Sequence, residues 1–193
     1  MPRLYLSLLS SAVFLGSVFS VQAQDIPKGK ATKLGLYVTA AEAAKLLQNK
    51  HTLFVDIRSR AEVAFLGLPK RADVHIPYMV MPMMASFNAE RGTYDLEMNP
   101  EFPNDFKSYA AAHGVSADTP IILMCRSGSR SARAANLLAD LGFTQVYSLV
   151  DGYEGDTAKD GPRKGERVVN GWRNAGLEWS YKLAATQVYP ADR

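Results

Sequence analysis

Cysteine is almost absent from this chain of 193 residues, which contains only Cys125. A single thiol excludes an intramolecular disulfide framework, a cysteine-rich zinc site and an iron–sulfur cluster held by this chain alone. A large excess of charge of one sign is also lacking, because 22 lysines and arginines against 19 aspartates and glutamates leave a net charge of +3. We therefore expect no nucleic-acid partner. The length and the 47% hydrophobic content favour one domain with a buried core.

A hydrophobic run of membrane length is lacking after residue 23, and the run before it is typical of an export signal. Arg3 precedes apolar residues from Leu4 to Phe19, and Val21-Gln22-Ala23 carries the small residues at which signal peptidase cleaves. We predict a signal peptide over 1–23 and a periplasmic mature protein that is not held at the membrane. A retained membrane anchor is the alternative, but the run is short for a span.

Short apolar runs alternate with helical segments through the middle of the chain. Strands are predicted at 52–56, 121–124 and 145–150, and helices at 40–49, 104–113 and 129–141. The first helix begins with a capping box of Thr39 and Glu42. Such alternation implies right-handed crossovers, so we predict an α/β fold with a mainly parallel sheet and helices on both faces. Irregular structure is expected at 67–71 and, as a mobile surface excursion, at 155–166.

The segment that carries chemistry is Cys125-Arg-Ser-Gly-Ser-Arg130, between a predicted strand and a predicted helix. Ligands of open α/β sheets bind beyond the carboxyl ends of the strands, where Cys125 falls. Ser127, Gly128 and Ser129 are small, so the backbone can curl and direct several amides and a helix N-terminus at the sulfur. Together with a guanidinium these groups can supply the roughly 2.7 kcal/mol that makes a thiol mostly thiolate. We expect a nucleophile rather than an inert buried thiol.

This loop resembles the active-site loop of the rhodanese-like sulfurtransferases, in which six residues cradle a cysteine that carries a sulfane sulfur as a persulfide. The likeness continues over about 34–181, in Val55-Asp56-Ile57-Arg58 with Glu62, in His75-Ile76-Pro77 and in Leu149-Val-Asp-Gly-Tyr153. It implies a rhodanese-like three-layer domain at 34–182 with about five strands. An N-terminal extension at 24–33 and a C-terminal tail at 183–193 would flank this domain.

The resemblance implies a two-step sulfur transfer without a cofactor or metal. Cys125 would take the outer sulfur of a donor such as thiosulfate or polysulfide, and a thiol, cyanide or a protein acceptor would then remove it. The loop residues from Arg126 to Arg130 would bind substrate, with Arg126 attracting the donor and Arg130 organising the loop. Asp56 and Arg58 would support the loop by an ion pair or hydrogen bonds, although an ordinary strand-end salt bridge fits equally well.

Some residues depart from the family's pattern, and these concern the rim of the pocket. Val74 replaces a usual glycine, Tyr78-Met79 replaces a usual Gly-Ala pair, and extra residues separate Glu62 from His75. The segment 155–166 is also longer than a minimal member of the family needs. We therefore expect this excursion to help select the donor or the acceptor.

Two other functions stay open at this stage. Cysteine phosphatases and arsenate reductases also place a thiolate in an arginine-closed anion cradle, but they usually have five residues between the cysteine and the arginine. Here four residues separate Cys125 from Arg130, and the further thiols that an arsenate reductase commonly needs are lacking. A non-catalytic module that carries sulfur or docks a partner is the other alternative, and the intact cysteine argues against it.

The remaining candidates have structural interpretations. The run Met79-Val-Met-Pro-Met-Met84 could bind copper(I) through its thioethers, but such a run is more often flexible packing. His75 is expected to be a hydrogen-bonded structural residue, because the three histidines of the chain show no ligand spacing. The tryptophans at 172 and 179 are expected to close the core.

Overall fold

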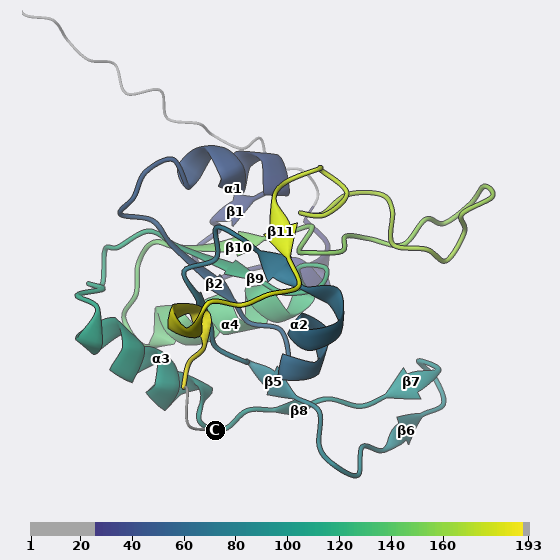
Figure 1. Ribbon diagram of the computed structural model, residues 1–193, viewed down its shortest axis with the longest axis horizontal. Helices are drawn as coiled ribbons and strands as arrows, with labels where there is room; N and C mark the ends of the chain where they lie inside the picture. Colours follow the sequence, from purple (N-terminus) through teal and green to yellow (C-terminus); the bar gives the residue numbers. More distant parts are fainter. Residues whose placement is uncertain (1–25, 191–193) are drawn as a thin grey trace, which may run out of the picture.

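A computed structural model describes residues 26–190, so the predicted signal peptide at 1–23 lies outside the described residues. Its centre is a five-stranded sheet in the order β1-β10-β9-β2-β4 (Figure 1). All four strand pairs are parallel. The strands of this sheet are β1 (Tyr37–Val38), β2 (Leu53–Asp56), β4 (Val74–His75), β9 (Ile121–Met124) and β10 (Val146–Leu149). The predicted α/β class with a parallel sheet is confirmed.

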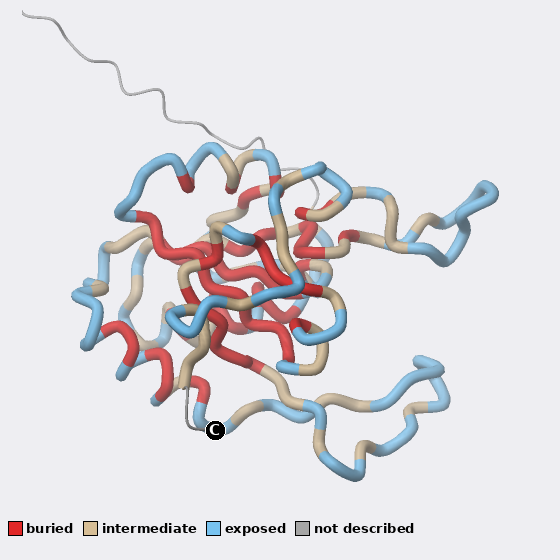
Figure 2. Tube along the Cα trace, in the orientation of Figure 1, coloured by how far each residue is buried: buried red, intermediate tan, exposed pale blue. Residues whose placement is uncertain are grey.

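Helices cover both faces of the sheet, because successive residues of the buried central strands point to opposite sides. Val55 and Leu123 belong to the core that includes residues of α3 and α4, whereas Phe54 and Met124 belong to the core that includes α1 and α2. Figure 2 shows this buried centre surrounded by exposed connections. The helices are α1 (Ala40–Leu46), α2 (Arg60–Leu66), α3 (Phe102–Ala112) and α4 (Ser129–Asp140).

Capping residues explain where these helices begin. The predicted capping box of Thr39 and Glu42 is present at α1, and a second one, formed by Ser59 and Glu62, begins α2. Helix α3 begins at Phe102, two residues earlier than predicted, because a proline in the first turn needs no intrahelical amide bond. Helix α1 ends at Leu46 rather than at residue 49, because the amides of residues 48 and 49 donate to the carbonyls three residues earlier, as in a 3₁₀ turn.

Two excursions leave the carboxyl edge of the sheet and project toward the same side in Figure 1. The first follows β4 and spans 79–98, and the second follows β10 and spans 155–166. Both are largely exposed (Figure 2). The first contains β5 (Met79–Val80), β6 (Phe87–Asn88), β7 (Thr93–Tyr94) and β8 (Glu97–Met98), with β5 paired to β8 and β6 paired to β7.

Two predictions about irregular or packed segments were wrong in part. Segment 67–71 was expected to be irregular, but it contains β3 (Leu68–Pro69), which pairs with β11 (Trp179–Ser180) from the far end of the chain. Met83 and Met84 are 98% and 88% exposed, so the packing interpretation fails for them. Both methionines lie in the first excursion, which projects away from the core. Copper binding by the methionine run stays an untested alternative.

Both terminal segments of the described chain contact the domain. The N-terminal extension contains η1 (Lys28–Lys30), where Lys30 Nζ donates to the carbonyl of Val150 and pairs with Asp156. The C-terminal tail contains η2 (Ala185–Gln187), and the amide of Tyr189 donates to the carbonyl of His75. Within residues 26–190, no helix is long and apolar enough to cross a membrane.

Candidate active site

Cys125 lies directly after β9, at the carboxyl edge of the sheet, and is 1% exposed. The backbone amide of Gly128 donates to its Sγ at 3.1 Å, and the Ser131 hydroxyl oxygen lies 3.7 Å from the same sulfur. Within the described loop, the Gly128 amide is the only backbone amide that is hydrogen-bonded to Sγ. Several such amides were predicted, so the sulfur has fewer amide contacts than expected. The sulfur thus accepts from the Gly128 amide and donates to the Ser131 oxygen.

The curled loop requires a glycine at position 128. Gly128 has a φ of +96°, and a Cβ added there would lie 2.1 Å from the carbonyl oxygen of Val150. No side chain fits this space, and the left-handed region is itself costly for residues other than glycine. The close approach of the loop to the end of β10 therefore directs the Gly128 amide at the sulfur.

The turn after β10 holds the first part of the loop from the other side. The amide of Tyr153 donates to the carbonyl of Cys125 at 2.8 Å, and the amide of Glu154 donates to that of Arg126 at 3.0 Å. At Gly152 an added Cβ would lie 2.5 Å from the backbone of Arg126, so this turn also needs a glycine. The two loops are thus joined backbone to backbone, at the positions that the resemblance indicated.

Arg130 and Glu62 form a bidentate ion pair between α4 and α2. Nη1 and Nη2 of Arg130 donate to the two carboxylate oxygens of Glu62 at 2.7 and 2.5 Å. Burial disfavours the Glu62 carboxylate, but the hydrogen bonds and charge of Arg130, with the Ser59 amide, lower the pKa of Glu62 to about 2. Burial lowers the pKa of Arg130. The hydrogen bonds to Glu62 and the charges of Cys125 and Glu62 outweigh burial and raise this pKa. Arg130 therefore ties the loop to α2.

The other predicted loop residues face outward to different degrees. Arg126 and Ser129 are exposed, and Ser127 is half-buried. Arg126 has no ion-pair partner within residues 26–190, which leaves its guanidinium available to a solute. The loop thus has one arginine fixed in the protein and one directed to the surface.

Asp56 and Arg58 form a fully buried ion pair beside the loop, with Arg58 Nη2 at 2.6 Å from Asp56 Oδ2. Burial lowers the pKa of Arg58, but the charge of Asp56 and its hydrogen bonds outweigh this and raise it. The Arg58 guanidinium stacks 3.8 Å from the ring centre of Tyr153, whose amide holds the Cys125 carbonyl. Among the described residues the pair makes no hydrogen bond to the loop 125–130, so Tyr153 links the pair to this loop. Support of the loop by Asp56 and Arg58 stays a prediction.

His75 is a structural residue, as predicted. Its Nε2 donates to the carbonyl of Arg58 at 2.7 Å, and the side chain is buried. Burial lowers the pKa of His75, against the charge of Asp56 and the bond to the Arg58 carbonyl, and so favours the neutral ring. His75 thus fixes the backbone that follows β2.

Two serines at the site were missed by the sequence analysis. The Ser131 hydroxyl donates to the carbonyl of Gly128 at 2.9 Å and lies 3.0 Å from the hydroxyl of Ser148 on β10. Both serines are fully buried. Their signal in the sequence is weak, although Ser131 stands in the first turn of α4, where a side chain can point back at the loop.

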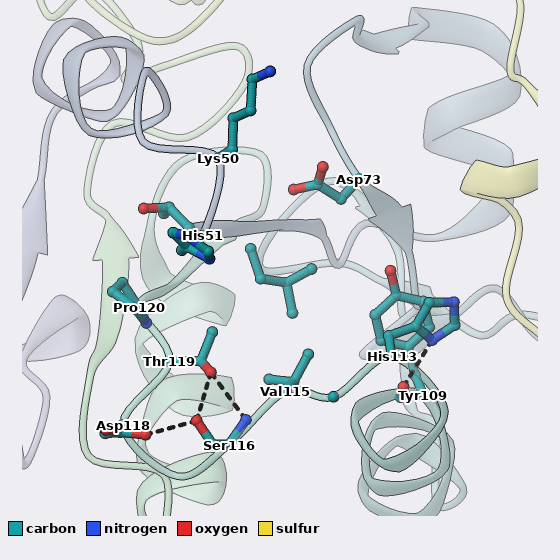
Figure 3. Close-up of a pocket in the computed structure, with 13 residues that line it drawn as sticks. Lys50, His51, Asp73, Tyr109, His113, Val115, Ser116, Asp118, Thr119 and Pro120 are labelled. Atoms are coloured by element: carbon teal, nitrogen blue, oxygen red, sulfur yellow. Dashed lines mark hydrogen bonds between the residues drawn. The ribbon is translucent and has the colours of Figure 1, made fainter.

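A cavity of about 470 Å³ opens at the opposite edge of the sheet. Its lining residues precede β2 and β9 and follow α3, as Figure 3 shows with Lys50, His51 and His113. His113 Nδ1 bonds to the carbonyl of Tyr109, and the two rings stack. Among the described residues no group of three or more histidine, cysteine, aspartate or glutamate side chains could hold a metal ion. This cavity is remote from Cys125.

The chain belongs to the rhodanese-like domain family, whose sequence profile matches residues 39–159. An uncharacterized protein of Rickettsia prowazekii, RP600, is 28% identical over 136 residues, which are 70% of this chain and 89% of that protein. The thiosulfate sulfurtransferase GlpE of Tolumonas auensis is 30% identical over 104 residues, which are 53% of this chain and 87% of that one. The crystal structure of Rv0390 from M. tuberculosis matches with a TM-score of 0.56 and 28% identity, covering 75% of this chain and 96% of that chain.

Proposed function

We propose that this protein is a sulfurtransferase that carries a sulfane sulfur as a persulfide on Cys125. One observation supports this most, namely the Gly128 amide at 3.1 Å from Sγ inside a loop that only glycine can form. That amide stabilises negative charge on Sγ when Cys125 acts as nucleophile and when it leaves as thiolate. The family and the sulfurtransferase among its relatives support the same reaction class.

The proposed reaction has two displacement steps at sulfur. In the first, the Cys125 thiolate attacks the outer sulfur of a donor such as thiosulfate, the donor S–S bond breaks, and sulfite leaves with the electron pair. In the second, an acceptor thiolate or cyanide attacks the outer sulfur of the persulfide, and Cys125 leaves as thiolate. Arg126, exposed beside the loop, attracts the anionic donor. Polysulfide can replace thiosulfate as the donor.

The phosphatase alternative is disfavoured by the role of Arg130. A phosphatase would need this arginine to bind the oxyanion, but both terminal guanidinium nitrogens of Arg130 are bonded to Glu62. The four-residue spacing between Cys125 and Arg130 agrees with that conclusion. A sulfur-carrier module without turnover would keep the same Cys125 chemistry and lack only the second step.

Incubation of residues 24–193 with thiosulfate, followed by intact-mass analysis, tests the proposal. We expect the mass to increase by one sulfur atom, the C125S variant to stay unchanged, and cyanide to remove the added sulfur as thiocyanate. Loading by polysulfide alone would change the donor but keep the class. Absence of loading by either donor would refute the persulfide mechanism. Reductant during purification is a necessary control, because a lone thiol over-oxidises.

We also propose that the protein is exported to the periplasm through residues 1–23. This rests on the apolar run and on the small residues that end at Ala23. Expression of the full chain in a double-membraned bacterium, followed by fractionation and N-terminal sequencing, should give a periplasmic chain that begins at Gln24. A chain that keeps Met1 in the cytoplasm or the membrane would contradict export.

A further inference from the structure

A second cavity, of about 330 Å³, lies between the 155–166 excursion and the segment before β11. Its volume is in the range of sites for small organic ligands and exceeds what a thiosulfate ion alone would fill. The lining side chains that carry charge or aromatic surface are Glu154, Arg163, Arg167, Arg173 and Trp179. None of these residues belongs to the catalytic loop.

The wall of this cavity is bonded to the catalytic loop. Glu154, which lines the cavity, and Gly155 both donate their amides to the carbonyl of Arg126, at 3.0 and 3.2 Å. Arg167 in turn donates from Nη1 to the carbonyl of Gly155 at 2.6 Å. Two hydrogen bonds therefore connect the Arg167 guanidinium to the residue that follows Cys125.

The cavity has more positive than negative charge available to a ligand. Arg163 is paired with Glu166, but Arg167 and Arg173 have no ion pair within the described part of the chain. Arg173 instead lies over Trp179, with its guanidinium carbon 4.3 Å from the ring centre. Planar guanidinium groups without a carboxylate partner are the donors that carboxylates and other oxyanions bind best.

The charges around Arg167 are consistent with binding of an anion beside its guanidinium. Burial and the positive charge of Arg126 lower the pKa of Arg167, while Glu154, Asp156 and Cys125 act in the opposite direction. Asp156 is already paired with Lys30. An anion bound beside Arg167 would add the negative charge that this partly buried guanidinium lacks.

We propose that this cavity is a subsite for the carboxylates of a small acceptor thiol, with Arg167 and Arg173 as its donors. The inference rests on the proposed sulfur transfer. In that step the bound acceptor thiolate attacks the outer sulfur of the Cys125 persulfide. A new S–S bond forms on the acceptor, the old one breaks, and Cys125 leaves with the electron pair, so no oxidant or reductant is needed.

Acceptor selectivity of thiosulfate-loaded protein is the test, with glutathione as the carboxylate-bearing thiol and 2-mercaptoethanol as the neutral one. We expect the ratio of kcat/KM for glutathione to that for 2-mercaptoethanol to fall about tenfold in R167Q and in R173Q. R167K should keep most of the ratio, because it keeps the charge. The control is K159Q, which removes one charge from the same excursion outside the cavity lining, and its ratio should stay at the wild-type value.

The outcomes separate the subsite from the reaction itself. Wild-type protein that takes no sulfur from any donor would refute the proposed function. Protein that loads normally, with the same acceptor ratio in R167Q, R173Q and wild type, would refute only the subsite. An equal loss in K159Q would mean a general surface-charge effect and would also overturn it. Slower loading by thiosulfate with an unchanged acceptor ratio would assign the cavity to the donor instead.

Discussion

The Glu62 carboxylate makes two sets of contacts, because it caps α2 and also pairs with Arg130 of the loop 125–130. Its Oε2 accepts from the Ser59 amide at 2.9 Å and from Arg130 Nη1 at 2.7 Å, and its Oε1 accepts from Arg130 Nη2. The start of α2 and the start of α4 are therefore held by the same side chain. Loss of this carboxylate should affect both stability and sulfur chemistry.

The E62Q variant should lose about 3 kcal/mol of stability at pH 7, because the pKa of Glu62 falls from 4.5 to about 2 in the folded protein. A carboxylate with a depressed pKa contributes its stability above pH 4.5 and loses it as the pH falls toward 2. The difference between wild type and E62Q in urea unfolding should therefore shrink below about pH 4.5.

The control for this prediction is E42Q, which removes the equivalent capping-box carboxylate of α1. Glu42 has no ion-pair partner in the described residues, so we expect a loss of about 1 kcal/mol or less. Equal losses in E42Q and E62Q would show that only the cap matters and that the pair with Arg130 contributes nothing.

G128A should abolish sulfur loading, since its Cβ would meet the Val150 carbonyl at 2.1 Å and the residue would keep a φ of +96°. We expect the loading rate followed by intact mass to fall by at least about 100-fold. Gly142 provides a matched control, because it has the same φ of +96° with open space around it. G142A should lose about 1 kcal/mol of stability and still load. Normal loading by G128A would contradict the assigned loop geometry.

S131A should load sulfur about tenfold more slowly than wild type. The Ser131 oxygen accepts from Cys125 Sγ at 3.7 Å, and its hydroxyl donates to the carbonyl of Gly128 at 2.9 Å. The variant therefore loses the contacts that position the sulfur and the Gly128 turn, and each such hydrogen bond is worth roughly 1 kcal/mol. S148A removes the next hydroxyl in the chain of contacts and leaves Ser131 beside the sulfur, so its effect should be smaller. Single-turnover loading rates at several thiosulfate concentrations measure both. A wild-type rate in S131A would remove Ser131 from the site.

The central strands and the loop 125–130 could be located from the sequence, because they depend on local signals. The run before Cys125 is continuous, apolar and of strand length, and β9 has the predicted bounds Ile121–Met124. The loop likewise contains its own small residues and its own helix start. Patterns of this kind are complete within about ten residues, so they can be identified without the rest of the fold.

The contacts that hold the loop could not be predicted, since they join residues far apart in the chain. Glu62 and Arg130 are separated by 68 positions, and Ser131 and Ser148 by 17. The strand at 68–69 was missed because its partner lies near residue 180. The exposure of Met83 was missed for another reason, since hydrophobic character alone does not show that a segment leaves the domain.

D151N should stabilise the protein at pH 7, because it removes a carboxylate charge that burial disfavours. Burial raises the pKa of Asp151, against the Ala40 and Gly171 amides that bond its Oδ2, and its Oδ1 has no hydrogen-bond partner within residues 26–190. The folded protein therefore loses stability when this group ionises. An asparagine keeps the acceptor and has no charge.

The gain in D151N should shrink as the pH falls toward and below the ordinary pKa of an aspartate, because the carboxyl group is then protonated in the folded and the unfolded state alike. Thermal unfolding at pH 4 and pH 7 measures the difference. D156N is the control, because Asp156 is paired with Lys30 and its replacement should not stabilise the protein at either pH. A loss of stability in D151N at pH 7 would mean that the ionised carboxylate is favourable where it stands.

Cys125 is 1% exposed in the resting protein, so the resting and the sulfur-loaded states of the proposed cycle differ in which sulfur atom is accessible. The resting thiol is covered by its own loop. Addition of one sulfur moves the terminal atom about 2 Å from Sγ, the length of one S–S bond. In the loaded protein the atom that acceptors must reach is therefore a different one from the atom that the loop protects.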